Sequence, residues 1–176
     1  HRDFRKPLIV FTPKSLLRHK KCVSTLADMA EGASFHRVLW DDAQSAPGST
    51  IALVPDTEIS RVVLCTGKVY YDLLEEREKR GEKRIQLLRI EQLYPFPARA
   101  LIQDLSRFRD AEMGWCQEEP KNMGAWSFVE PNLEWVLDHI GAKHRRPRYA
   151  GRPSSAATAT GLMRKHLHEL KNLLDE

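Results

Sequence analysis

The chain has 176 residues, of which 41% are hydrophobic and 30% charged, a balance typical of one ordinary globular domain. No stretch approaches the roughly 18 consecutive apolar residues that a membrane-spanning helix requires, which argues against a protein of that class. The net charge of +4 comes from 28 cationic and 24 anionic residues interleaved along the chain. Without a recognition motif or interleaved aromatics, this modest excess does not favour nucleic acid as a partner.

The first residues of the chain predict that it is part of a longer polypeptide, and its cysteines predict a reducing compartment. The sequence begins His-Arg-Asp-Phe, with neither an initiator methionine nor a charged-then-apolar leader, so we expect residues 1–176 to be one domain cut from a longer polypeptide. Its three cysteines form no C-x-x-C pair, which predicts reduced thiols in a cytosol-like compartment. Cys65 and Cys116 lie in apolar runs and are expected to belong to the core.

Short apolar runs closed by turn residues predict the strands, and amphipathic segments between them predict the helices. Strands are expected over residues 7–11, 61–66, 85–90 and 113–117, with a short fifth over 147–150. Helices are expected over residues 68–80, 98–108, 132–140 and 161–174. Residues 41–60 lack periodicity and are interpreted as a surface loop, with a possible short strand at 51–54. This alternation predicts an α/β domain with a mostly parallel sheet of about five strands and helices on both faces.

One strand-to-helix turn is a candidate anion site. Gly67 and Lys68 follow a predicted strand and open a predicted helix, where backbone N–H groups carry partial positive charge and the lysine adds a full one. A tight turn that needs one glycine explains the same residues. The sequence leaves both readings open, because it contains neither a G-x-G-x-x-G nor a Walker loop.

Other polar groups give weaker indications. Glu118 and Glu119 are adjacent at a strand end, and neighbouring residues of an extended chain point to opposite sides, so a catalytic acid pair is not expected. Arginines gather around Tyr149, at Arg145, Arg146, Arg148 and Arg152, as a phosphate site or as a solvated connector. The seven histidines show no metal-binding spacing. From these patterns alone, no function follows.

Five runs in this order carry a more specific signal. They are Arg5–Arg18 (RKPLIVFTPKSLLR), Cys65–Leu73 (CTGKVYYDL), Arg89–Pro97 (RIEQLYPFP), Trp115–Gly124 (WCQEEPKNMG) and Tyr149–Pro153 (YAGRP). Together they resemble the C-terminal domain of the thiamine-diphosphate-dependent, decarboxylating first component of 2-oxoglutarate dehydrogenase complexes. The resemblance covers nearly the whole chain and is weakest over residues 41–58.

The resemblance implies a transketolase-type C-terminal domain within an enzyme of the tricarboxylic acid cycle. Such a parent decarboxylates 2-oxoglutarate and passes the succinyl group to a lipoyl group on a dihydrolipoyl succinyltransferase. Its thiamine diphosphate and Mg²⁺ are held by upstream domains, so no catalytic or cofactor residue is assigned to this chain and the chain alone is expected to be inactive. The location would be the cytoplasm in a bacterium, or the mitochondrial matrix in a eukaryote.

The resemblance also implies regulation and assembly. Some relatives bind AMP or acetyl-CoA in this region, and ligands of open α/β sheets bind at the carboxyl ends of strands. The effector candidates are Thr12, Gly67, Lys68, Gln117, Arg148 and Arg152. A homodimer is also implied, with candidate interface residues Tyr94, Phe96, Trp126 and Phe128, although core packing explains these aromatics equally well.

Two alternatives stay open. The same domain could belong to a 2-oxoadipate dehydrogenase or to a fused 2-oxoglutarate decarboxylase, because the substrate pocket would lie upstream in each case. A stand-alone nucleotide-binding regulatory module is the other reading, and the missing initiator methionine counts against it.

Overall fold

The computed structural model describes residues 3–41, 43 and 51–176. The chain divides into two units, His1–Ala33 and Ser34–Glu176, which are described separately. None of the helices in the described part is long and apolar enough to cross a membrane.

The first unit contains only short 3₁₀ turns, η1 (Lys14–Arg18) and η2 (Ala27–Met29), among its described residues. The predicted strand at residues 7–11 is wrong. Leu8 and Phe11 are 86% and 95% exposed, and the segment has no strand partner in the described part of the chain. An apolar run can form a strand only where a second strand satisfies its backbone N–H and C=O groups, and this run has the composition without the partner.

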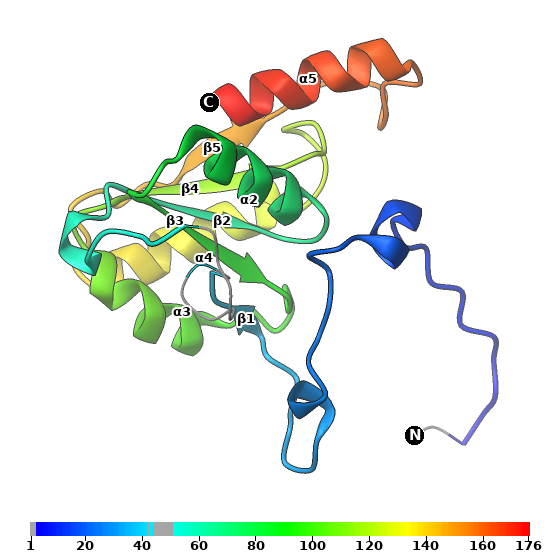
Figure 1. The fold of residues 1–176 in the computed structure, drawn as a ribbon, viewed down its shortest axis with the longest axis horizontal. Helices are drawn as coiled ribbons and strands as arrows, with labels where there is room; N and C mark the ends of the chain where they lie inside the picture. The colour runs from blue at the N-terminus through cyan, green and yellow to red at the C-terminus, as the bar shows by residue number, and fades with distance from the viewer. Residues whose placement is uncertain (1–2, 42, 44–50) are drawn as a thin grey trace. The chain divides into compact units, whose positions relative to one another are not determined.

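The second unit is built on one mixed five-stranded sheet, so the predicted α/β class is confirmed (Figure 1). Its strands are β1 (Val38–Leu39), β2 (Arg61–Cys65), β3 (Ile85–Ile90), β4 (Glu112–Gln117) and β5 (Arg148–Gly151). Their spatial order is β1-β3-β2-β4-β5, in which only β1 is antiparallel, to β3. The carboxyl ends of β2, β3, β4 and β5 therefore meet at one edge of the sheet.

Four described helices cover the two faces of this sheet: α2 (Val69–Arg80), α3 (Ala98–Leu105), α4 (Trp126–His139) and α5 (Met163–Asp175). Helices α3 and α4 lie on one face, and α2 and α5 lie on the other (Figure 1). Three of the four begin within two residues of the predicted start, but α4 begins six residues earlier than expected. It contains Pro131, which removes one helical hydrogen bond and is nevertheless accommodated within the helix.

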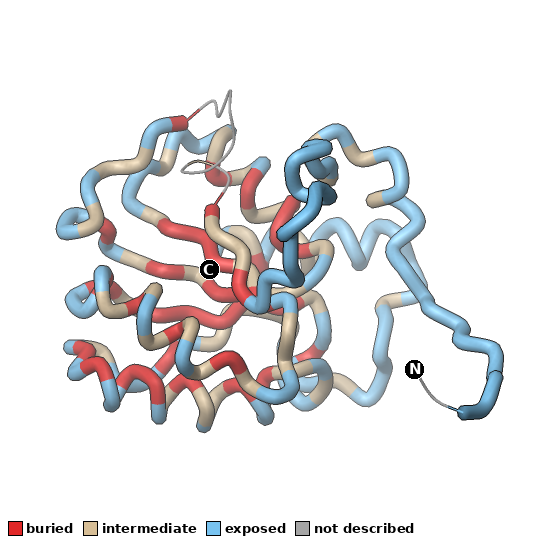
Figure 2. The backbone as a smooth tube through the Cα atoms, turned by 90° about the horizontal axis from the view of Figure 1, so that it is seen from below, coloured by how far each residue is buried: buried red, intermediate tan, exposed pale blue. Residues whose placement is uncertain are grey.

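The two faces are packed unequally. Alternate residues of the strands, such as Val62, Leu64 and Trp115, point toward α3 and α4 and join the large apolar core of the domain. In Figure 2 the buried residues follow the strands and the inner sides of the helices. The opposite face, under α2 and α5, is covered less completely. Among the residues of α5, only Leu173 is buried. This second face is where a cavity remains.

The predicted surface loop at 41–60 is only partly right. It carries the 3₁₀ turn η3 (Asp56–Glu58), and residues 51–54 form no strand, while residues 42 and 44–50 lie outside the described part of the chain. Three of its members are nevertheless buried: Asp41, Ile51 and Ile59. The loop therefore contributes to the interior, although it lacks the periodicity by which buried segments are recognised.

Candidate functional site

The carboxyl edge of the sheet gathers most of the candidate effector residues. Gly67 follows β2 with a φ of 71°, a conformation that favours glycine, and Lys68 opens α2. Gln117 ends β4 and pairs with Gly151 of β5, which places Arg152 at the same edge. The sequence expectation that strand ends converge here is met for Gly67, Lys68, Gln117 and Arg152.

Lys68 is held by two carboxylates. Its Nζ lies 2.6 Å from Asp72 Oδ2, one turn along α2, and 2.9 Å from Glu118 Oε1, directly after β4. Burial by itself would lower the pKa of Lys68, but the hydrogen bonds to Asp72 and Glu118 outweigh it and raise that pKa. The lysine is thus a fixed cation that ties α2 to β4, and an incoming anion would compete with two internal carboxylates.

Gln117 is the centre of a hydrogen-bond network. Its Oε1 accepts from Trp115 Nε1 at 2.9 Å and from the backbone N–H of Trp126 at 3.0 Å. Its Nε2 donates to the carbonyl oxygen of Met123 at 2.7 Å, with those of Glu119 and Pro120 at 3.3 and 3.2 Å. The side chain therefore fixes the loop between β4 and α4, a structural role that sequence reasoning did not anticipate. The sequence did contain a signal for this role: a polar residue ends a buried strand, and a proline follows shortly after it.

The same loop is tied to the segment after β5. Asn122 exchanges two hydrogen bonds of 3.0 Å with the backbone of Ser155, and the backbone N–H of Lys121 donates to Arg152 O at 3.0 Å. Tyr149 Oη lies 3.1 Å from Glu119 O and 2.9 Å from Arg152 O. Burial raises the pKa of the Tyr149 hydroxyl to about 12, so it stays a hydrogen-bond donor at neutral pH.

Arg152 forms an ion pair within the domain. Its Nε lies 2.5 Å from Glu169 Oε2 in α5, and its Nη1 donates to Thr158 O at 3.3 Å. The pair is largely buried, with side-chain exposures of 12% and 17%. Arg152 therefore links β5 to α5, and a shallow cavity of about 240 Å³ lies beside it against Glu118 and Glu119.

Arg148 does not join this group. Arg148 begins β5 and pairs in register with Gly114, so its side chain lies toward the amino end of the strands, where its Nη1 is 3.4 Å from Glu112 Oε2. The expectation that Arg148 lies near Lys68 is wrong, because Arg148 is the first residue of β5 and Lys68 lies beyond the carboxyl end of the parallel strand β2. Thr12 is exposed in the first unit, outside the described helices and strands.

Sequence reasoning also missed Arg89. Arg89 is the second-last residue of β3. Its guanidinium carbon lies 4.4 Å from the ring centre of Tyr70, and its Nη1 lies 2.9 Å from the hydroxyl of Tyr71. Its Nε lies 3.0 Å from Glu91 Oε1. Such a cation–π and hydrogen-bonded setting fixes an arginine rather than leaving it free to bind an anion.

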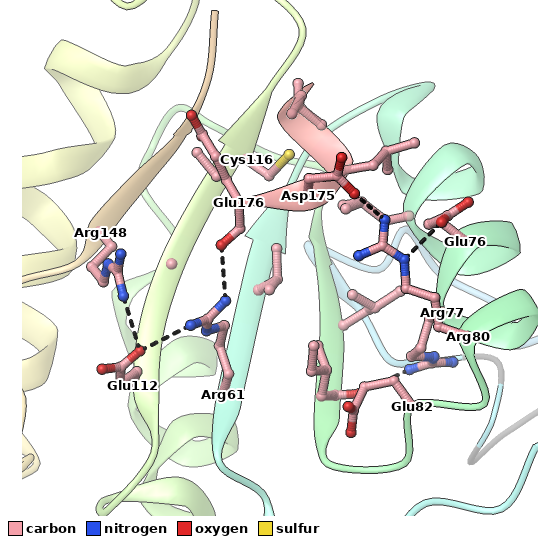
Figure 3. Close-up of a pocket in the computed structure, with 18 of the residues that line it drawn as sticks. Arg61, Glu76, Arg77, Arg80, Glu82, Glu112, Cys116, Arg148, Asp175 and Glu176 are labelled. Carbon is pink, nitrogen blue, oxygen red and sulfur yellow. Dashed lines mark hydrogen bonds and ion pairs between the residues drawn. The ribbon is translucent and has the colours of Figure 1, made fainter. Parts of the chain in front are cut away.

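A cavity of about 360 Å³ opens at the same edge, lined by Thr66, Leu93, Trp115, Gln117 and Phe128, among others. A larger one of about 460 Å³ lies between the sheet, α2 and α5, toward the amino ends of the strands (Figure 3). Cys116 lines the larger cavity, and burial raises the pKa of its thiol to about 12, so it is a poor nucleophile and metal ligand. The described residues contain no cluster of three or more His, Cys, Asp or Glu side chains able to hold a metal ion.

Three of the four aromatic candidates differ from the fourth in their surroundings. Tyr94 is 82% exposed and Phe128 40%, and the Phe128 ring packs edge-to-face on Phe96 at a centroid distance of 6.2 Å. Trp126 is buried, and the centroid of its ring lies 5.2 Å from that of Tyr149. Tyr94, Phe96 and Phe128 remain candidates for an interface, whereas Trp126 is used for packing within the domain.

Comparison with known proteins bears directly on identity. Residues 23–176 match the family described as 2-oxoglutarate dehydrogenase C-terminal. Proteins described as the 2-oxoglutarate dehydrogenase E1 component are similar over 175 residues, with 68% identity in Brucella ovis and 67% in Brucella abortus. The aligned region is 99% of this chain but only 17% of each relative, so the chain spans about a sixth of their length.

Proposed function

Because the chain belongs to the 2-oxoglutarate dehydrogenase C-terminal family, we propose that it is the C-terminal domain of a decarboxylating enzyme that acts on 2-oxoglutarate. In this proposal the parent transfers the succinyl product to a lipoyl group on a dihydrolipoyl succinyltransferase. The 68% identity with a protein described as the 2-oxoglutarate dehydrogenase E1 component carries the argument. Neither of the relatives named above is described as a 2-oxoadipate dehydrogenase or as a fused decarboxylase.

The domain itself contributes scaffolding rather than chemistry. Among the described residues, the two cations of the carboxyl edge, Lys68 and Arg152, are held by carboxylates, which supports a structural role for this edge. Thiamine diphosphate and Mg²⁺ are assigned to the remainder of the parent, where they would supply the carbanion chemistry. The residues described here would then hold the last part of the chain in a fixed shape against that remainder.

The test is 2-oxoglutarate-dependent reduction of ferricyanide with added thiamine diphosphate and Mg²⁺. The polypeptide that contains residues 1–176 together with the preceding domains is expected to be active, and residues 1–176 alone inactive. Activity with 2-oxoadipate but not with 2-oxoglutarate would replace the substrate in this proposal. Activity of the isolated chain would remove the scaffolding role.

A nucleotide effector remains a second proposal for the carboxyl edge. Gly67 and Lys68 at the start of the 12-residue helix α2, with Arg152 at the same edge, are the groups that support it. Both cations already have carboxylate partners, so binding would exchange those partners for phosphate oxygens. Charge reversal of Lys68 and Arg152 should weaken AMP and acetyl-CoA binding at least tenfold, and Arg148→Glu, at the far end of the strands, is the matched control. Unchanged affinity in the first two variants would remove this proposal.

A further inference from the structure

Helix α5 is attached to the domain by one half of its length. All of its residues from 163 to 168 are exposed. Its apolar contacts come from the second half, where Leu173 is buried and Leu170 and Leu174 are half-buried. By comparison, α4 on the opposite face of the sheet has five buried residues. Because apolar burial is the main force that holds a surface helix in place, α5 is the more weakly attached of the two.

The space between α5 and the sheet is not filled. The cavity of about 460 Å³ lies there, and strand residues that include Val63, Leu87, Gly114 and Cys116 form its floor (Figure 3). Leu173 of α5 forms part of its cover. A side chain that borders a cavity lacks the dispersion contacts that a filled core would give it. Apolar packing beneath α5 therefore depends largely on Leu173.

Ion pairs and hydrogen bonds supply the rest of the attachment. Arg152 Nε lies 2.5 Å from Glu169 Oε2, and this pair is largely buried. Arg80 Nη2 of α2 lies 2.5 Å from Asp175 Oδ1, in an exposed pair (Figure 3). Glu176 accepts one backbone N–H of β5 and one guanidinium N–H of β2, at 2.9 and 3.2 Å. These contacts all lie in the second half of α5 or directly after it, and salt weakens the exposed ones.

The segment before α5 has the composition of a hinge. Residues 156–162 (AATATGL) are mostly small and exposed. Directly upstream, Ser155 is held by two hydrogen bonds of 3.0 Å with Asn122. A rotation of α5 about residues 156–162 would break the hydrogen bond of 3.3 Å from Arg152 to Thr158 O. It would leave β5 and the loop after β4 in place, as expected for a hinge at the end of a helix.

We propose that α5 is a hinged lid, which opens from the sheet as a unit while the sheet and the other helices stay folded. Opening breaks the Arg152–Glu169 pair and exposes Leu173 together with the floor of the cavity. Local openings of this kind have lower free energies than global unfolding where few apolar contacts hold a segment. Cys116 is 1% exposed under the closed lid, so reaction of its thiol reports the open state.

The test measures how fast iodoacetamide modifies each cysteine of the intact protein, with each modified site assigned by peptide mass spectrometry. Cys65 is an internal reference, because it pairs in register with Cys116, is fully buried and does not line the cavity. Cys65 should react only through global unfolding, whereas Cys116 should react at least roughly tenfold faster through opening of the lid. Low concentrations of urea should accelerate Cys65 steeply and Cys116 weakly, because opening one helix exposes much less surface than unfolding the domain.

Three leucine variants separate opening of the lid from global unfolding. Leu173→Ala should accelerate Cys116 at least roughly thirtyfold, because it removes the buried side chain that anchors the lid. Leu167→Ala, at a position of the same helix that is 56% exposed, should leave the rate unchanged. Leu133→Ala, in the core on the opposite face, destabilises the closed and the open form equally, so it should accelerate Cys65 but not Cys116.

Glu169→Gln removes the largely buried charge of the lid and should accelerate Cys116 roughly tenfold, as expected for one lost charged hydrogen bond. Equal rates for the two cysteines, or parallel acceleration of both by urea or by Leu133→Ala, would overturn the proposal. Fast modification of Cys116 that urea, Leu173→Ala and Glu169→Gln leave unchanged would mean that the reagent enters with α5 in place, and would overturn it as well. If circular dichroism shows that Leu133→Ala is unfolded, the urea dependence of the unsubstituted protein decides alone.

Discussion

The guanidinium of Arg77 in α2 forms a buried ion pair with the carboxylate of Asp41, with side-chain exposures of 3% and 0%. Arg77 Nη2 donates to Asp41 Oδ1 at 2.7 Å, and Asp41 Oδ2 also accepts the backbone N–H of Leu87 at 2.8 Å. Arg77 Nη1 donates further to Ile85 O at 3.1 Å. One carboxylate, on the first residue of the 41–60 loop, therefore joins this loop to both α2 and β3.

Removing one partner of this pair should be costly. Asp41→Ala leaves a buried guanidinium without its counterion, and such losses reduce the free energy of unfolding by about 3–5 kcal/mol. Urea unfolding followed by circular dichroism measures it. Arg145→Gln is the control: it breaks the Arg145–Asp138 pair, in which both side chains are 67% exposed, and should cost less than about 1 kcal/mol. Equal costs for the two variants would contradict the structural role assigned to Asp41.

Gln117→Leu tests the network at the end of β4. The substitution keeps the approximate size but leaves Trp115 Nε1 and the backbone N–H of Trp126 without their acceptor, and each unsatisfied buried donor costs about 1–3 kcal/mol. We expect a loss of about 2–4 kcal/mol in the free energy of unfolding. Gln92→Leu, which removes one exposed hydrogen bond to Pro95 O, should cost less than about 0.5 kcal/mol. A Gln117 variant as stable as the Gln92 variant would refute the network.

The inner strands of this fold were predictable because their residues are buried on both sides. β2, β3 and β4 are short apolar runs closed by turns, and burial requires that composition. β1 has only two residues, Val38 and Leu39, too few for a recognisable pattern. The run at 7–11 has strand composition, but pairing depends on a neighbour that local sequence does not specify. The strand order could not be predicted either, because it is set by packing between segments far apart in the chain.

The sequence predicted where the candidate site lies, but not what its side chains do there. Topology brings Gly67, Lys68 and Gln117 to one edge, as the strand–helix alternation indicated. What each side chain does there depends on partners such as Glu118 and Glu169, which no spacing rule identifies. Arg148 was misplaced because it was grouped with the carboxyl ends of the strands, although it is the first residue of β5 and its side chain lies toward their amino ends.

Exposed aromatic residues lead to a prediction about assembly. If the parent is a homodimer through this surface, replacing Tyr94 and Phe128 together by Asp should shift the protein toward monomers. Aromatic residues at the centre of an interface often contribute about 2 kcal/mol each, so the dissociation constant should rise at least roughly thirtyfold. Light scattering after size-exclusion chromatography measures the mass. Met163→Asp, at an exposed apolar position on α5, is the control and should leave the mass unchanged. An unaffected mass in the double variant would exclude this surface.

Two buried thiols predict how stability depends on alkaline pH. Burial raises the pKa of Cys65 well above its ordinary value, and burial raises that of Cys116 from 9.0 to about 12. Below pH 8 both thiols are protonated in the folded and the unfolded chain, so they contribute no pH dependence there. Above pH 9 the unfolded chain releases its thiol protons while the folded chain keeps them, so stability falls as pH rises.

Between pH 8 and 10, each thiol should lower the free energy of unfolding by about 1.4 kcal/mol, about 3 kcal/mol for the pair. Urea unfolding under reducing conditions at these two pH values gives the difference. Cys116→Ala should halve the decrease, because only Cys65 then resists ionisation. Val63→Ala enlarges the same cavity without removing a titratable group, so it should lower stability at both pH values and keep the full decrease. If Cys116→Ala keeps the full decrease too, the thiol of Cys116 is not shielded as the structure requires, and solvent reaches the floor of the cavity under α5.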